Sequence, residues 1–208
     1  MSGLSPRRRD NRHPRNVVII VTEGITEEIY FNGLKQRNSN IEMKPRKGKR
    51  TNARQLMEEC ERQIYANEID IERGDIAICA FDVDNNSQDD IKVAIEIAEK
   101  NKIIVAVSNP CFELWYLLHF RDINHRVTSI EVQKELLGYI EKFEKTKDYR
   151  DLLITKKEKA IARAEKIVRK RSIRTTFDYA HNKNNPCTSV HCAINAIERL
   201  ARENQRRQ

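Results

Sequence analysis

Short apolar runs alternate with segments of helical periodicity in the first part of the chain. The apolar runs are NVVIIV (16–21), DIAICAFDVD (75–84) and KIIVAVSN (102–109). Their β-branched residues are typical of strands buried on both faces of a sheet. Apolar residues recur at helical spacing over 26–37, 51–68 and 89–101. This alternation favours a parallel sheet with right-handed crossovers, so residues 16–122 are predicted to form a three-layer α/β domain.

The rest of the chain follows other patterns. Residues 41–50 are expected to be a short strand or loop, and residues 1–15, with five arginines, a flexible basic arm. Residues 123–208 are predicted to form a helical extension packed on the α/β domain. Its candidate helices cover 129–143, 155–170 and 189–203. The last of these is expected to begin after Pro186, with Thr188 or Ser189 as its N-cap.

Composition indicates a cytoplasmic protein with no membrane contact. Among 208 residues, 39% are hydrophobic and 34% charged, and no apolar run approaches the roughly 20 residues that span a bilayer. The N-terminus does not have the pattern of a secretory signal. Five scattered cysteines without a CxxC pair favour a reduced compartment. One group, His181, Cys187, His191 and Cys192, is spaced unlike any common zinc pattern, so a structural zinc is not expected.

The net charge of +8 is concentrated in two places, the N-terminal arm and the segment KPRKGKR. Such blocks are usually a solvated face, but a basic field also gathers and steers nucleic acid. The residues expected to grip phosphates are Lys44, Arg46, Lys47, Lys49 and Arg50, with the arginines of the arm beside them.

Acidic residues follow two of the predicted strands. Glu23 and Glu27 come after the first, and Asp82 and Asp84 end the second. Ligands gather at the carboxyl ends of parallel strands, so both pairs are expected at one edge of the sheet. Hard oxygen ligands without His or Cys suit Mg²⁺ or Mn²⁺.

Each pair also has an ordinary structural explanation. Glu27 in a first helical turn complements the helix dipole, which contributes about 0.3–1 kcal/mol. The segment DVDNN is also a common polar exit from a strand. An EF-hand is excluded, because Ser87 and Val93 stand where its glycine and bidentate glutamate belong.

Three segments, VTEGITEEIYFNGL, FDVDNN and SNPCFELWYLLHF, resemble the RloB-like proteins, whose core is a Toprim domain. The resemblance covers about 16–122, with a weaker similarity in 182–200. It implies a Toprim-like Rossmannoid sheet flanked by helices. It also implies a place in bacterial anti-phage defence, beside a partner ATPase of the ABC or AAA type, and relatives that act as nucleases, including on tRNA.

The resemblance implies roles for individual acids. Glu23 matches the Toprim glutamate, a metal ligand or general acid/base, and Glu27 the second glutamate of the nuclease branch. Asp82 and Asp84 match the metal-binding DxD, and Glu113 in NPCFELW is a further candidate acid. The apolar neighbours of Glu113 are expected to be core residues. Two polar residues nearby are also expected to be structural: His119 in the core, and Asn109 in the turn that follows the third strand, where it could also touch substrate.

The expected function is therefore a nuclease dependent on Mg²⁺ or Mn²⁺ that cleaves phosphodiester bonds, with RNA or tRNA preferred over DNA because of the resemblance. The alternative is a Toprim-like module that binds nucleic acid or an ATPase without cutting. A phosphate-handling enzyme of another α/β class is disfavoured, because the chain has no glycine-rich phosphate loop and only six glycines. Topoisomerase is excluded by the absence of an assignable nucleophilic tyrosine, and primase is disfavoured because nothing resembles a zinc module or a template-binding domain. No site for an organic cofactor is expected, and a homo-oligomer remains open.

Overall fold

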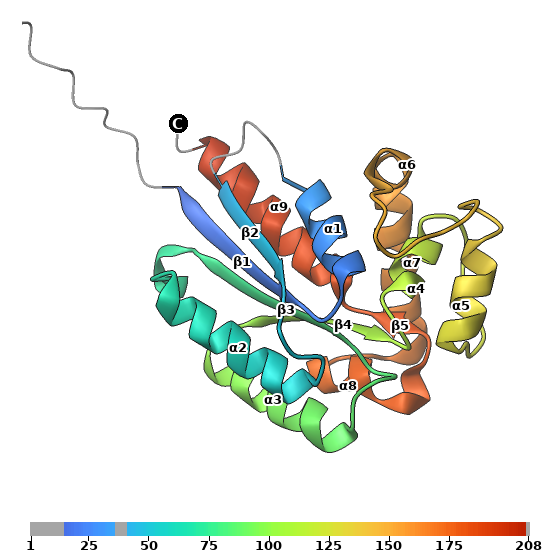
Figure 1. Ribbon diagram of the computed structural model, residues 1–208, viewed down its shortest axis with the longest axis horizontal. Helices are drawn as coiled ribbons and strands as arrows, with labels where there is room; N and C mark the ends of the chain where they lie inside the picture. Colours follow the sequence, from blue (N-terminus) through green and yellow to red (C-terminus); the bar gives the residue numbers. More distant parts are fainter. Residues whose placement is uncertain (1–14, 36–40, 207–208) are drawn as a thin grey trace, which may run out of the picture.

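A computed structural model describes residues 15–35 and 41–206 of the protein. The predicted basic arm, apart from Arg15, lies outside the described residues. Figure 1 shows a central twisted sheet with helices on both of its faces. The structure therefore confirms the predicted α/β fold with a Rossmannoid, mostly parallel sheet.

The sheet has five strands in the described residues, in the order β2-β1-β3-β4-β5. Four of them are parallel: β1 (Asn16–Thr22), β2 (Ile41–Lys47), β3 (Ile76–Asp82) and β4 (Ile104–Asn109). The fifth, β5 (Cys187–Thr188), is antiparallel to β4. Because β1 and β3 are direct neighbours, the residues that follow them lie side by side at the carboxyl edge of the sheet.

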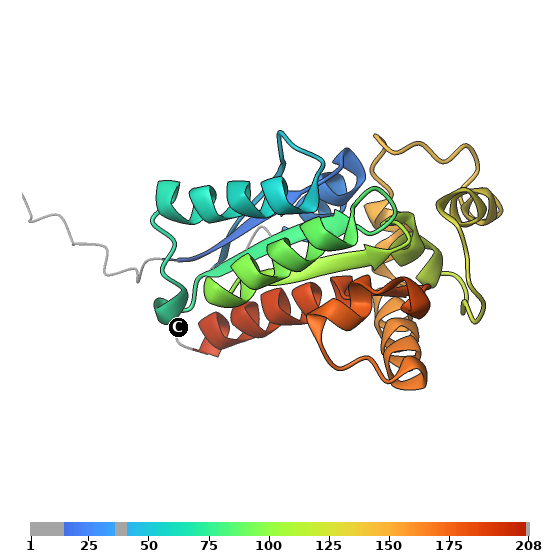
Figure 2. The same cartoon turned by 90° about the horizontal axis from the view of Figure 1, so that it is seen from below.

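Alternate residues of the strands face two separate cores, as the period of two in a strand requires. Val18 and Ile20 of β1 face the side covered by helices α1 (Ile25–Gly33), α4 (Glu113–Leu118), α7 (Lys157–Arg171) and α9 (Val190–Arg206). Ile19 and Val21 face the side covered by α2 (Ala53–Ala66), α3 (Gln88–Lys100) and α8 (Thr176–Ala180). Figure 2 shows α9 running along the sheet on one side and α2 on the other.

The predicted helices of the first part are present with small shifts at their ends. The helix expected over 26–37 ends at Gly33, and the helix expected over 51–68 begins at Ala53, where the Asn52 side chain accepts from the Gln55 amide. A short 3-10 turn, Ile71–Arg73, follows α2. The segment 41–50, left open between strand and loop, is the outer strand β2 as far as Lys47.

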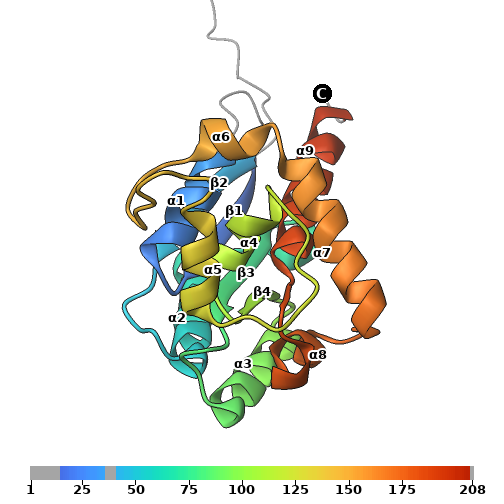
Figure 3. The same cartoon turned by 90° about the vertical axis from the view of Figure 1, so that its right-hand side faces the viewer.

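The second part of the chain differs more from its prediction. The helix expected over 129–143 ends early, as α5 (Ser129–Leu136), and residues 137–149 form turns and loop. The unpredicted short helices are α6 (Arg150–Ile154), α8 and the 3-10 turn Asn182–Asn184. The other two expected helices are α7 and α9. Figure 3 shows α5 and the loop before α6 at the carboxyl end of the sheet, on the side of α1.

The expectation that the second part is entirely helical is wrong at β5. The Ser189 hydroxyl accepts from the Val107 amide at 2.8 Å and donates to the Val105 carbonyl at 2.9 Å. The Thr188 hydroxyl donates to the Val107 carbonyl at 3.1 Å. These hydroxyls therefore complete the edge of β4, a role that a helix-cap pattern in the sequence does not reveal.

None of the helices in the described ranges is both long enough and apolar enough to cross a bilayer. All five cysteines are free thiols, and four of them are buried. The thiols within the sheet, such as Cys79, pack as small apolar side chains.

Candidate active site

Four buried or partly buried carboxylates lie at the carboxyl edge of the sheet (Figure 3 looks onto this end). Glu23 directly follows β1, and Asp82 is the last residue of β3. Glu27 lies in the first turn of α1, and Glu113 is the first residue of α4, shortly after β4. The charges of Glu23 and Glu113 both act on Glu27, so strands and helices far apart in sequence bring these acids into one cluster.

Glu23 is held in place by the end of the neighbouring strand. Its carboxylate accepts from the Asp82 amide at 3.0 Å and from the Asn86 side chain at 3.4 Å. Asn86 in turn donates to the Asp82 carbonyl at 2.7 Å and accepts from the Ala53 amide. Burial raises the pKa of Glu23, and these hydrogen bonds lower it by less. Asn86, the second asparagine of DVDNN, therefore orients Glu23.

Glu27 folds back over Gly24, and this contact explains the glycine of the EG-x-x-E segment. A Cβ added at Gly24 would lie 2.5 Å from Glu27 Oε2. The backbone of Gly24 has φ −119°, which any residue can adopt, so a side chain at this position would first meet the Glu27 carboxylate, which would have to move. Burial, together with the charges of Glu113 and Glu23, raises the pKa of Glu27 to about 7.

Asp82 lies where the charges of the other acids act together. Burial raises its pKa well above the ordinary value, and the charges of Glu27, Glu23, Glu113 and Asp84 raise it further. Its Oδ1 atom is buried without a hydrogen-bond partner among the described residues. An unpaired buried carboxylate oxygen is costly, and such atoms are commonly found where a ligand or cation binds.

Glu113 is buried at the start of α4, only 1% exposed, and pairs with Lys145. Lys145 Nζ lies 2.9 Å from Glu113 Oε1, whereas Glu113 Oε2 is buried without a partner in the described part of the chain. Burial lowers the pKa of Lys145, but the Glu113 charge and their hydrogen bond raise it by more. The cluster therefore contains one cation, which sequence reasoning did not identify.

Asp84 lies at the rim of the cluster. It follows the end of β3, is exposed to solvent and accepts a hydrogen bond from the Ser129 hydroxyl at the start of α5. Its charge still raises the pKa of Glu23 and of Asp82. The two aspartates of DxD thus differ in burial, with Asp82 inside the cluster and Asp84 at its margin.

The chemistry of the cluster fits a hard divalent cation, but its present geometry is not that of a formed metal site. All the atoms that could coordinate a metal here are carboxylate oxygens. In the described residues, Asp82 and Glu113 each have a buried carboxylate oxygen without a hydrogen-bond partner. In the described residues, no three acidic, His or Cys side chains are arranged to hold one metal ion. Glu23 is turned to the Asp82 amide and Glu27 lies over Gly24, so binding would require these side chains to rotate.

The basic residues predicted to bind nucleic acid fall into two groups. Lys44 and Arg46 pair with acids, at 3.3 Å from Glu42 and 3.6 Å from Glu59. Lys47 is level with Thr22 in the register of β2 with β1, and therefore lies at the edge of the sheet next to the acids. The loop that follows carries the last two of the predicted residues, Lys49 and Arg50.

The other predicted polar residues are engaged elsewhere. Asn109 donates to the Tyr179 and His181 carbonyls, and so joins the end of β4 to the C-terminal end of α8. His119 is buried, with Nδ1 2.9 Å from the Trp115 carbonyl, and burial lowers its pKa to about 4. These contacts make both residues parts of the packing.

The His and Cys residues weighed as zinc ligands also have other partners. Cys187 donates to the Tyr179 carbonyl at 3.1 Å, and His181 Nδ1 accepts from the Lys183 amide at 3.2 Å. His191 Nε2 lies 3.5 Å from the adjacent Cys192 sulfur. Across the described ranges, these side chains do not form a group that could bind a metal.

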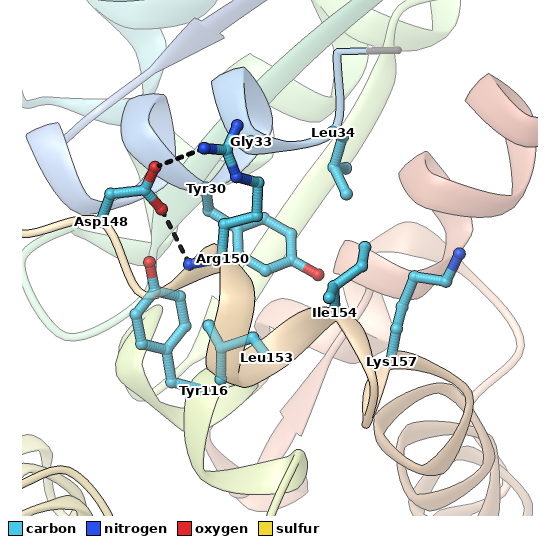
Figure 4. Close-up of a pocket in the computed structure, with 9 residues that line it drawn as sticks. All are labelled: Tyr30, Gly33, Leu34, Tyr116, Asp148, Arg150, Leu153, Ile154 and Lys157. Carbon is cyan, nitrogen blue, oxygen red and sulfur yellow. Dashed lines mark hydrogen bonds and ion pairs between the residues drawn. The ribbon is translucent and has the colours of Figure 1, made fainter.

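A shallow hollow lies behind the cluster, one turn further along α1 and α4 (Figure 4). It is lined by Tyr30, Gly33, Leu34, Tyr116, Asp148, Arg150, Leu153, Ile154 and Lys157. Arg150 pairs with Asp148, and its side-chain stem would be 3.4 Å from a Cβ at Gly33. The loop that carries Lys145 is therefore packed against α1 through Arg150.

The fold and the edge cluster together define a Rossmannoid α/β protein with several carboxylates at the carboxyl ends of its strands. The family model described as RloB-like protein matches residues 18–197, so the chain belongs to the RloB-like family. The match extends through most of the predicted helical extension, which the sequence resemblance reached only in part. No curated protein and no solved structure gives a significant match.

Proposed function

We propose that the protein is a metal-dependent nuclease of Toprim type that hydrolyses phosphodiester bonds. The observation that carries the proposal is the group of buried acids at the edge of the sheet, with unpartnered oxygens on Asp82 and Glu113. Acids whose charges raise one another's pKa destabilise the fold unless a cation or a proton neutralises them. A site that retains such acids is better suited to bind a cation than to support the structure.

In this proposal Glu27 and Asp82 would hold a divalent cation, with Asp84 at the rim, and Glu23 or Glu113 would adjoin a second. When bound, such a cation polarises the phosphate and lowers the pKa of a water. Glu23, oriented by the Asp82 amide and Asn86, accepts a proton from the attacking water. The water oxygen bonds to phosphorus as the bond to the leaving oxygen breaks, and the leaving oxygen takes a proton from solvent.

The proposed substrate is nucleic acid, with RNA or tRNA preferred over DNA. Lys47 ends β2 at the same edge of the sheet as the acids, and Lys49 and Arg50 follow in the next loop; these three would bind flanking phosphates. A role in anti-phage defence under the control of a partner ATPase is supported only by the resemblance to Toprim-containing relatives. The preference for RNA has the same support.

The test is cleavage of mixed tRNA and of plasmid DNA in Mg²⁺ and in Mn²⁺, comparing wild type with Glu27→Gln and Asp82→Asn. Both substitutions preserve side-chain volume, and each is expected to lower the rate by at least about 10²-fold, because a site group is lost. The matched control is Glu96→Gln, an exposed acid on α3, which should cut like wild type. Equal rates for all four proteins would disprove the proposal.

A second candidate is a binding module that does not cut. The observation that favours it is the geometry of the acids, because no three of the described His, Cys or acidic side chains are arranged around one cation, and Lys145 already neutralises part of their charge. Calorimetric titration with Mn²⁺ separates the two candidates. Metal binding that Asp82→Asn abolishes supports the nuclease, whereas nucleic-acid binding without metal binding or cutting supports the module.

A further inference from the structure

We propose that Lys145, in the loop between α5 and α6, contacts the scissile phosphate. The inference rests on the proposed function and adds a residue that lies outside the acidic motifs. Lys145 is separated from Glu113 by 32 positions along the chain, yet its ammonium lies 2.9 Å from the buried Glu113 carboxylate of the acidic cluster.

The loop that bears Lys145 is fastened to the site helix α1. The Thr26 hydroxyl, next to Glu27, donates to the Lys145 carbonyl at 3.2 Å. A few residues further on, the stem of Arg150 packs against Gly33 at the other end of the same helix (Figure 4). The backbone at Lys145 is thus positioned relative to the helix that carries Glu27.

Aromatic side chains stiffen the same loop from within. Phe143 and Tyr149 stack at 5.4 Å between ring centroids, and Tyr116 of α4 packs edge-on against both. The Tyr149 hydroxyl accepts from the Glu144 amide at 2.8 Å. Residues 143–149 are therefore held together by side-chain packing and a hydrogen bond, and this packing keeps Lys145 next to α4.

The two members of the Lys145–Glu113 ion pair differ in exposure. The side chain of Lys145 is 55% exposed, whereas that of Glu113 is 2% exposed. An ammonium has three N–H donors, and among the described residues Glu113 is the acceptor that the structure records for Lys145 Nζ. The ammonium therefore faces the buried acids on one side and solvent on the other, where a polyanionic substrate would approach.

The charge balance of the site calls for such a cation. A phosphodiester that enters a cluster with Glu23, Glu27, Asp82 and Glu113 is repelled by every carboxylate that stays ionised. The ammonium of Lys145, between the acids and solvent, offsets part of this repulsion and can donate to a non-bridging phosphate oxygen. In the transition state, where negative charge on those oxygens rearranges, a preorganised donor is worth about 10²-fold or more in rate.

The alternative is that Lys145 only neutralises Glu113. The experiment therefore measures binding of a fluorescein-labelled single-stranded 20-nucleotide RNA in Ca²⁺ over a range of salt, and cleavage in Mg²⁺ or Mn²⁺. The single variants are Lys145→Gln, Lys145→Arg and the control Lys147→Gln, which changes an exposed lysine of the same loop. Glu113→Gln is compared with Glu113→Gln/Lys145→Gln, because in that background the charge of Glu113, the ion-pair partner of Lys145, is absent.

If Lys145 contacts the phosphate, Lys145→Gln lowers kcat by about 10²-fold and Lys145→Arg restores part of it. The salt dependence of binding then falls by about 0.7 in log–log slope, both in Lys145→Gln and between Glu113→Gln and the double variant. Lys147→Gln keeps the wild-type kcat.

Three other outcomes would each overturn the proposal, and they separate its failure from that of the proposed function. If wild type cuts and Lys145→Gln cuts equally well, the nuclease stands and the Lys145 contact is wrong. If wild type binds RNA without cutting, the nuclease fails, and an unchanged salt slope in the double variant rejects the contact as well. If wild type neither binds nor cuts, both are rejected.

Discussion

Single side chains decide the form of this site, and Gly24 shows how. Glutamates after a buried strand are expected from the sequence, but the reason for the glycine between them appears only in three dimensions, where Glu27 Oε2 occupies the space of a Cβ. The position of a glutamate along the chain can therefore be predicted, whereas the direction of its carboxylate cannot.

We predict that Gly24→Ala displaces the Glu27 carboxylate, because the new methyl group would lie 2.5 Å from Oε2. Mn²⁺ affinity should rise by up to about tenfold, since Glu27 then no longer occupies the position over residue 24 from which it has to rotate to hold a cation. The fold should be retained, since φ −119° suits alanine. Calorimetric titration with Mn²⁺ checks the affinity. Gly33→Ala is the matched control on the same helix, where the new methyl group would be 3.4 Å from the Arg150 stem and should leave the affinity unchanged.

The raised pKa of Glu27 predicts a pH-dependent effect of its substitution in metal-free protein. Folded Glu27 titrates near pH 7 and unfolded glutamate near 4.5, so the folded state holds more protons between these values. This acid therefore favours folding below pH 4.5 relative to higher pH, and its contribution is lost as pH rises through 7. Glu27→Gln should stabilise the protein by about 2 kcal/mol more at pH 8 than at pH 5.

Urea unfolding in EDTA at the two pH values measures this difference. His119, with its pKa lowered to about 4, has the opposite dependence, so the comparison is made between variant and wild type at each pH. Glu96→Gln, an exposed substitution, should show no such difference. A Glu27→Gln effect that is equal at pH 5 and pH 8 would contradict the raised pKa.

At the scale of elements, the sequence predicts strands and helices of the first part well because their periodicities are regular. Three of the parallel strands, β1, β3 and β4, and the acids after β1 and β3 follow from apolar runs and the alternation with helices, whereas the pattern leaves β2 open between strand and loop. The second part is predicted less well. The short β5 has two residues, and α6 and α8 five each, too few to show a period. Lys145 was missed because nothing in a lysine-rich loop distinguishes one lysine before the chain folds.

The Ser189 hydroxyl supplies hydrogen bonds to the backbone of β4, and its removal tests how much they stabilise the fold. Because this buried hydroxyl bonds to both Val107 and Val105, Ser189→Ala should leave a strand amide and a carbonyl unpaired and lower the free energy of unfolding by about 1–3 kcal/mol. Ser172→Ala is the control, since the exposed Ser172 side chain has no hydrogen bond within the described residues. Chemical denaturation of both variants checks the difference, and equal stabilities would show that water replaces the hydroxyl.

At the scale of the whole molecule, the α/β part and the helical extension share one core. Ala193, Ile194 and Ile197 of α9 are buried in the same cluster as Val18 and Ile20 of β1. The extension also supplies β5 to the sheet and Lys145 to the acids. A boundary near residue 122 therefore marks a change in secondary-structure pattern more than a change in packing.

We predict that the intact chain unfolds in a single cooperative transition, with equal calorimetric and van't Hoff enthalpies. A fragment that ends at residue 122 should not fold alone, because the face of its sheet covered by α9 would be exposed to water. Circular dichroism and calorimetry test both statements. Coexpression of the two fragments, 16–122 and 123–208, is the control and should restore the fold, whereas a stable, folded 16–122 fragment would contradict the shared core.

The outer strand β2 has a consequence for how copies of the chain can associate. Pro45 stands in the middle of this strand, opposite Ile20, and lacks the amide hydrogen that a further strand would need. Glu42 and Lys44 place charges beside it. Edge strands with proline and charged residues resist edge-to-edge aggregation. Addition of a strand from a second molecule is therefore disfavoured at β2, so self-assembly of this chain through that edge of the sheet is not expected.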